Sequence, residues 1–218
     1  EHAGAVLCAK LSLGALAQGD RWFGGKTRSP WNPQIGSSGS SAGSACSVVA
    51  GLVAFTLGSE TLGSIISPSI RCGASSLRPT FGRVSRAGCM PLSWSLDKIG
   101  PICRTVEDCA LVFDAIHGTD DRDPTAGSFE FEWPTRQKLK GLKVGYTQSR
   151  RSQPKEERAD LALFQSLGCE LVEVKLPSVE SFLPLIAIID IEAASVFDEL
   201  LRAGHTDGWN SWDEDFRA

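Results

Sequence analysis

Residues 36–69 read GSSGSSAGSACSVVAGLVAFTLGSETLGSIISPS, with a cluster of serine and glycine on either side of an apolar run. Small residues recur at helical spacing over residues 41–53, which predicts a buried helix, and the apolar run at 54–60 predicts a buried strand. The chain would leave the first cluster along the helix and return to the second along the strand. Ser40 and Ser64, which are 24 positions apart, would then meet at one end of a sheet.

Other interpretations of the two clusters fit the sequence less well. A flexible linker needs room between domains, but residues 36–44 lead directly from a Trp/Pro-rich loop into the predicted helix. A phosphate-binding loop needs a lysine at the start of its helix, and the chain has none between Lys26 and Lys98. Residues 39–43 match the G-x-S-x-G pattern of a nucleophile elbow, but no strand is predicted directly before them. The histidines that could serve such a serine lie at predicted helix ends: His117 and His205.

The rest of the chain alternates short apolar runs with helical patterns. Strands are predicted at residues 4–12, 54–60, 141–147 and 169–177, and a long ordered loop at 21–33. Further helices are predicted at residues 104–118, 155–168 and 186–203, with an irregular acidic end at 204–218. Thr105 and Asp108 have the spacing of a capping box at the start of the first of these helices. One face of that helix is predicted to consist of Val106, Ala110, Phe113 and Ile116. Strand, helix and strand over 141–177 form a βαβ unit, so the predicted fold class is α/β, a mixed sheet flanked by helices.

Composition restricts the classes of function. The net charge of −4 gives no basic field, so we expect no direct nucleic-acid partner. The seven cysteines include no CxxC pair and are predicted to be small buried hydrophobes in a reducing compartment. The three histidines lack ligand spacing, so no metal is expected. Without a signal peptide or a run of 18 apolar residues, the protein is predicted to be cytoplasmic, with no membrane partner.

A serine is a weak nucleophile unless a base removes its proton. No suitably placed histidine follows either serine cluster, so the base would be a lysine that acts through a second hydroxyl.

These clusters resemble the amidase signature family. The family patterns GGSSGGSA, DTGGSIR-x-P, CG and LKPTYGRVSR appear here as SGSSAGSA (38–45), ETLGSIISP (60–68), CG (72–73) and LRPTFGRVSR (77–86). The similarity is closest over residues 32–117 and looser over 140–177, and a helical tail follows at 178–218. The resemblance implies an α/β/α sandwich and an amide hydrolase that needs no cofactor.

The resemblance also implies a role for each matching residue. Ser64 would be the nucleophile, and Ser40, after a cis peptide bond from Gly39, would pass on its proton. Ser41 would support Ser40 by hydrogen bonding. Backbone N–H groups would stabilise the oxyanion at four positions: Thr61, Leu62, Gly63 and Ser64.

Some positions depart from the family pattern. Leu62 replaces a glycine beside the oxyanion donors, where its bulk is expected to narrow the acyl pocket. Ile66 replaces an arginine, and Arg71 would either supply the lost charge or form a structural ion pair.

The catalytic lysine of the family has no match in this chain, since Lys10 and Lys26 occupy other positions. We therefore expect residues 1–218 to be a single partial domain, a fragment that lacks an N-terminal part with the lysine and a C-terminal part.

The predicted function is hydrolysis of a linear carbon–nitrogen amide bond in a small-molecule substrate, through an acyl-enzyme and a Ser–cisSer–Lys triad. Two alternatives remain open. One is a non-catalytic, amidase-like binding or scaffold protein. The other is the A subunit of a tRNA-dependent amidotransferase, which acts on glutamine beside a tRNA-binding partner. A homodimer is also left open.

Overall fold

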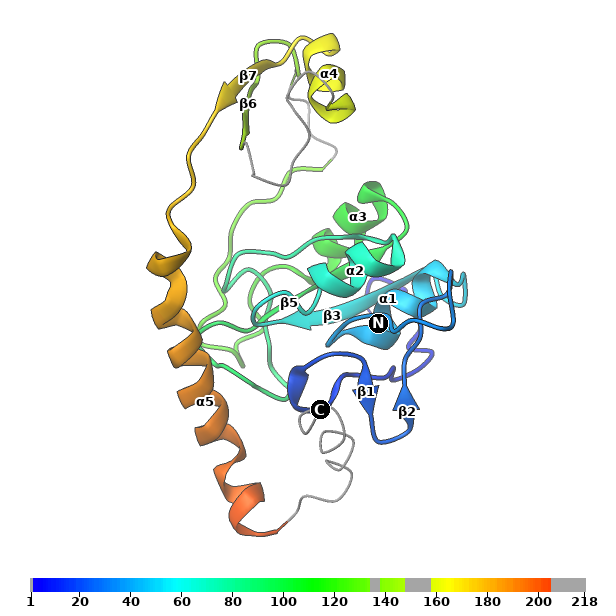
Figure 1. The fold of residues 1–218 in the computed structure, drawn as a ribbon, viewed down its shortest axis with the longest axis vertical. Helices are drawn as coiled ribbons and strands as arrows, with labels where there is room; N and C mark the ends of the chain where they lie inside the picture. The colour runs from blue at the N-terminus through cyan, green and yellow to red at the C-terminus, as the bar shows by residue number, and fades with distance from the viewer. Residues whose placement is uncertain (1, 134–137, 148–157, 205–218) are drawn as a thin grey trace. The chain divides into compact units, whose positions relative to one another are not determined.

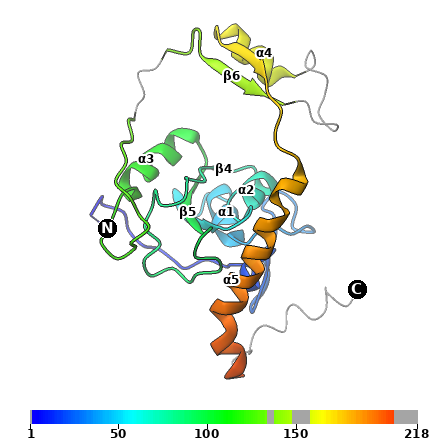
Figure 2. The same ribbon diagram turned by 90° about the vertical axis from the view of Figure 1, so that its left-hand side faces the viewer.

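The computed structural model describes residues 2–133, 138–147 and 158–204, which separate into two compact units (Figures 1 and 2). The first unit contains residues 1–133 and 187–218, and the second contains residues 134–186. The predicted irregular end at 205–218 lies outside the described residues.

The first unit is built on an antiparallel sheet with the strand order β3-β5-β4. Its strands are β3 (Phe55–Glu60), β5 (Lys98–Cys103) and β4 (Ser75–Ser76). Its helices are α1 (Ala42–Val49), α2 (Ile66–Cys72) and α3 (Val106–Ile116). Helices α1 and α3 pack on β5, and α1 also contacts β3 and α2 (Figure 1). The helix predicted at 41–53 is confirmed, although it ends earlier. The strand predicted at 54–60 is also confirmed, but it is not fully buried, because Phe55 and Leu57 are exposed.

The core of this unit lies between α1, α2 and β5. Ala45, Ile65, Cys72 and Ile102 are fully buried there and pack together. Gly58 makes this packing possible, because a Cβ at that position would lie 2.8 Å from Ser41 Oγ and 3.0 Å from Ile102. The small residues of this region thus bring α1 close to the sheet.

Helix α3 begins as its sequence predicts. The Thr105 hydroxyl accepts a hydrogen bond of 3.0 Å from the Asp108 N–H, which satisfies one of the free donors of the first turn. The predicted apolar face is partly wrong, because Val106 is 73% exposed. Cys109 is buried in its place, beside Ala110 and Phe113.

The predicted strand at residues 4–12 is wrong. Residues 5–11 form no regular element, and Val6 and Leu7 are about four-fifths exposed, at 82% and 79%. A strand needs a neighbour that pairs with its N–H and C=O groups, and none of the described strands pairs with this segment. Only its end is held, where Ser12 O accepts a hydrogen bond from Gly43 N at 2.9 Å.

The predicted loop at 21–33 contains a short antiparallel hairpin, β1 (Arg21–Trp22) and β2 (Gly25–Lys26), after a 3₁₀ turn, η1 (Ala15–Ala17).

The second unit contains the predicted βαβ arrangement. Strands β6 (Lys143–Tyr146) and β7 (Glu170–Glu173) pair in parallel, and α4 (Ala159–Ser166) connects them. The start of the predicted helix, residues 155–157, lies outside the described part. The mixed topology thus occurs as separate antiparallel and parallel sheets, each with helices, which confirms the α/β class. That the chain forms one partial domain stays a prediction.

A 3₁₀ turn, η3 (Val179–Phe182), precedes the long helix α5 (Leu183–Arg202), which confirms the helix predicted at 186–203. None of the helices in the described residues combines the length and apolarity needed to cross a membrane.

Candidate active site

The two serine clusters lie side by side at the start of α1 and α2. Ser41 N donates a hydrogen bond of 3.1 Å to Ser64 O, which joins the clusters directly. Ser40, Ser41 and Ser64 are all buried, and the peptide bond between Gly39 and Ser40 is cis. The two clusters are therefore adjacent, as the spacing of Ser40 and Ser64 predicted, and both serines line one cavity.

Ser40 and Ser41 differ in what their hydroxyls contact. The Ser41 hydroxyl donates to Ser59 O at 3.1 Å and accepts from Ser59 N at 3.2 Å, so it ties the first cluster to β3. The buried hydroxyl of Ser40 has no hydrogen-bond partner among the described residues. A buried hydroxyl without a partner carries a desolvation cost, which is typical of a group that acts on a ligand or a reacting atom.

The backbone N–H groups of the turn between β3 and α2 differ in whether they donate hydrogen bonds. Gly63 has φ = +99°, a left-handed conformation that glycine adopts without strain. Among the described residues, the N–H groups of Thr61 to Ser64 donate no hydrogen bond, whereas those of Ile65 and Ile66 donate to Glu60 Oε2 at 2.7 and 2.9 Å. Within the part of the chain that the structure describes, the four N–H groups of residues 61–64 therefore have no hydrogen-bond acceptor.

Two further contacts hold this turn from the side of β5. The Thr61 hydroxyl donates to Asp97 Oδ1 at 2.5 Å, and Lys98 Nζ donates to Thr61 O at 3.2 Å. Burial, followed by the nearby charge of Arg78, lowers the pKa of Lys98 below its ordinary value. Lys98 is bound to the turn and does not line the cavity described next, and neither does any other lysine of the described chain.

Ser40, Ser59, Thr61 and Ser64 open onto a cavity of about 580 Å³. Its remaining wall comes from residues 13–17, Phe23, parts of the segment 86–97, Ile99, residues 122–124 and two residues of α5. Leu62 is 68% exposed and does not line the cavity, so the expected narrowing of the pocket by its side chain is not observed. Arg71 lies exposed in the last turn of α2.

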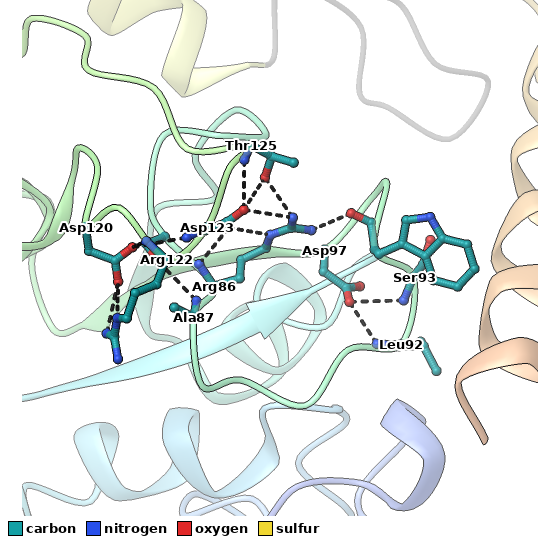
Figure 3. Close-up of polar contacts among 11 residues, drawn as sticks. Arg86, Ala87, Leu92, Ser93, Asp97, Asp120, Arg122, Asp123 and Thr125 are labelled. Atoms are coloured by element: carbon teal, nitrogen blue, oxygen red, sulfur yellow. Dashed lines mark hydrogen bonds and ion pairs between the residues drawn. The ribbon is translucent and has the colours of Figure 1, made fainter. Parts of the chain in front are cut away.

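Charged residues at the cavity wall form hydrogen bonds or ion pairs with neighbouring residues (Figure 3). Arg86 Nε donates to Asp123 Oδ2 at 3.0 Å, and Asp97 Oδ2 accepts from the N–H groups of Leu92 and Ser93 at 2.8 and 3.0 Å. Helix α5 is held against the same segment, because Ser93 donates its hydroxyl proton to Glu192 at 2.5 Å. Burial raises the pKa of Glu192, but the hydrogen bonds from Ser93 and Ser95 outweigh it and lower the pKa below its ordinary value.

The family of the chain follows from comparison with known proteins. The family model described as Amidase matches residues 1–217. The chain belongs to the amidase family. The A subunit of a glutamyl-tRNA(Gln) amidotransferase from Staphylococcus epidermidis is 37% identical over 226 residues, which cover 96% of this chain and 47% of that protein.

Solved structures agree with the family. The A subunit of glutamyl-tRNA(Gln) amidotransferase from Thermotoga maritima matches 94% of this amidase chain and 49% of its own, with a TM-score of 0.80 and 33% identity. The match to native peptide amidase from Stenotrophomonas maltophilia covers 90% of this chain and 45% of that enzyme, with a TM-score of 0.73 and 31% identity. The amidase chain spans about half the length of the curated relatives it matches.

Sequence reasoning missed several residues that shape this amidase site. Glu60 and Asp97 hold the turn, and the segment 86–97 supplies one wall of the cavity. Glu60 could have been found, because it occupies the position of the family aspartate that begins the second pattern. Asp97 carries no comparable local signal, since its partner Thr61 lies 36 positions away.

Ser40 and Ser41 of this amidase chain are expected to differ in their effect on stability. Ser41→Ala removes both hydrogen bonds to Ser59 and should lower the free energy of unfolding by about 1–3 kcal/mol. Ser40→Ala removes a hydroxyl without a described partner and should change it by less than about 1 kcal/mol. Denaturant unfolding of both variants measures the difference, and an equal loss in both would contradict the assigned contacts.

Acid is expected to destabilise the first unit through Asp123. The hydrogen bond from Arg86 lowers the pKa of Asp123 well below its ordinary 3.8, and Thr125 adds to this although burial opposes it. Because the folded-state pKa is the lower one, this stabilisation is complete above the ordinary pKa. It is lost as the pH falls below about 4 towards the folded-state pKa. Asp123→Asn should therefore unfold more easily near neutral pH and show a weaker pH dependence in acid. An unchanged acid dependence in this variant would exclude Asp123 as its source.

Proposed function

We propose that this protein hydrolyses a linear carboxamide through an acyl-enzyme formed on Ser64. The observation that carries the proposal is the shared cavity, which Ser40 and Ser64 both line. Next to it, the N–H groups of residues 61–64 donate no hydrogen bond to any described residue. Acyl transfer requires a nucleophile, a proton carrier and donors for the oxyanion. The proposal is supported because Ser40, Thr61 and Ser64 line one cavity.

The proposed reaction has two halves. The Ser64 hydroxyl oxygen attacks the amide carbonyl carbon while its proton passes to Ser40, whose own proton passes to a base. The N–H groups of residues 61–64 stabilise the negative oxygen of the tetrahedral intermediate. Protonation of the leaving nitrogen breaks the carbon–nitrogen bond and releases ammonia or an amine. Water then attacks the Ser64 ester and releases a carboxylic acid.

The base in this proposal is the catalytic lysine of the amidase signature family, which has no match within residues 1–218. The unpartnered hydroxyl of Ser40 is the group that such an ammonium or amine would contact, since it is buried and has no described partner. A lysine in this environment must be neutral to accept a proton, and burial lowers its pKa in that direction.

A second candidate function is favoured by the relatives. The A subunits of two glutamyl-tRNA(Gln) amidotransferases are 37% and 39% identical to this chain. In that role the amide would be that of glutamine, and other subunits would be stable partners. Co-purification of the intact protein with such subunits would separate this role from that of an independent hydrolase. The non-catalytic alternative, the cytoplasmic location and the homodimer stay predictions.

Labelling with a fluorophosphonate tests the nucleophile. The expected result is one adduct in the intact mass, located on Ser64. Cleavage after Glu60 by a glutamate-specific protease places Ser40 and Ser64 on different peptides, so mass spectrometry separates the two serines. An adduct on Ser40, or adducts spread over several serines, would contradict the assignment.

A further inference from the structure

The cavity that holds Ser64 is walled mainly by apolar side chains. Leu13 and Leu16 come from the N-terminal segment, Met90 and Trp94 from the segment 86–97, and Leu200 from α5. Several of these remain open to water: Met90 is 76% exposed and Trp94 49%. Contiguous apolar surface around a few convergent polar groups is typical of a site for an apolar ligand.

The charged side chains of the same wall are already engaged. Arg86 contacts Asp123 and Thr125, with distances of 3.0 Å to Asp123 Oδ2 and 2.8 Å to the Thr125 hydroxyl. Arg122 contacts Asp120 at 3.0 Å. Asp97 accepts three hydrogen bonds, from the Thr61 hydroxyl and the N–H groups of Leu92 and Ser93. The contact between Arg86 and Asp123 is mostly buried, so a charged substrate group would break it only at a high cost. The Arg122 side chain is 72% exposed, so water screens its charge and it offers a substrate group only a weak surface ion pair.

We infer that the acyl group of the substrate is uncharged and apolar, an alkyl or arylalkyl chain, rather than the charged amino-acid end of glutamine. This inference rests on the proposed function, because it assumes that the acyl carbon reaches Ser64. A cavity of about 580 Å³ is of the size that holds a small organic molecule. The apolar chain would lie along Met90, Trp94 and Leu200 and remove their surface from water.

Two fluorophosphonates with the same reactive group test the inference. One carries a decyl tail, and the other a tail of equal length made of ethylene glycol units that ends in an ammonium group. The rate of Ser64 labelling is measured for each with the intact protein and divided by the hydrolysis rate of the probe itself. The decyl probe is expected to label Ser64 at least about tenfold faster, as burial of two or three methylenes predicts.

A pair of variants in α5 provides the matched control. Leu200 lines the cavity, whereas its neighbour Leu201, which is 50% exposed, does not. Leu200→Gln is expected to reduce the preference for the decyl probe severalfold, and Leu201→Gln to leave it unchanged. Equal effects of the two variants would overturn the assignment of this wall.

Hydrolysis of two amides completes the test. The two amides are glutamine and pentanamide, which has the carbon chain of glutamine without its charged groups. The rate of ammonia release is measured for each amide and gives its kcat/KM. A higher kcat/KM for pentanamide supports the inference. A higher value for glutamine, or equal labelling by the two probes, overturns it while Ser64 remains the nucleophile. Failure of both probes to label Ser64 refutes the proposed function instead, and the inference with it.

Discussion

Ser64→Ala is expected to lower the rate of amide hydrolysis by about 10⁴-fold or more, because the variant lacks the hydroxyl on which the proposed acyl-enzyme forms. The residual rate would come from the oxyanion donors and from substrate binding, which the substitution leaves in place. Ser64 makes its described hydrogen bond through its backbone oxygen, to Ser41 N, so the variant should fold normally. Initial rates on the best amide substrate measure the loss.

Ser67→Ala is the matched control for this experiment. Ser67 lies three positions further along, is exposed, and does not line the cavity, so its substitution should leave the rate unchanged. Hydrolysis by Ser64→Ala at the wild-type rate would exclude Ser64 as the nucleophile. A wild-type thermal unfolding temperature in Ser64→Ala would show that the loss of activity is not a loss of folding.

The sequence predicted those parts of the fold that depend on local pattern. Helix α1 and strand β3 follow from small and apolar residues at regular spacing, and the βαβ arrangement of the second unit follows from two apolar runs around a helical one. The meeting of Ser40 and Ser64 follows from the same two elements, since a helix and a returning strand bring their ends together. The cis peptide bond before Ser40 followed from the family resemblance alone and is confirmed.

Strand β5 could not be predicted from local pattern. It contains Gly100 and Pro101, which are both disfavoured in strands, yet it lies between β3 and β4. Tertiary packing explains the glycine in this strand, because a Cβ at position 100 would lie 2.1 Å from Leu77 O. Glycine permits the close approach of the chain at Leu77, which no neighbouring residue in the sequence reveals.

The strand predicted at 4–12 failed for the opposite reason. Its apolar pattern is typical of a strand, but pattern alone supplies neither a pairing partner nor a layer that covers Val6 and Leu7. The cavity wall at 86–97 was missed because the Ser93 hydroxyl bonds to Glu192, which lies 99 positions away. Contacts of this range leave no periodic signal.

Glu60→Ala is expected to lower the free energy of unfolding by about 3 kcal/mol and to slow Ser64 labelling in the protein that remains folded. The Glu60 carboxylate is almost fully buried and accepts hydrogen bonds from the N–H groups of Ile65 and Ile66, while Arg78 contacts its other oxygen at 3.4 Å. Without the carboxylate, two N–H groups lose their acceptor at the start of α2, directly after Ser64. The turn at residues 61–64, whose N–H groups are the proposed oxyanion donors, would then lose its fixed geometry.

Two further variants separate the backbone contacts of Glu60 from its ion pair. Glu60→Gln keeps an acceptor oxygen and should cost about half as much as Glu60→Ala. Arg78→Ala should cost less than about 1 kcal/mol, because the Arg78 side chain is 48% exposed and water screens the pair. Denaturant unfolding gives the three free energies, and labelling rates report the turn. If Arg78→Ala destabilised the protein as much as Glu60→Ala, the ion pair rather than the hydrogen bonds to Ile65 and Ile66 would hold the turn in place.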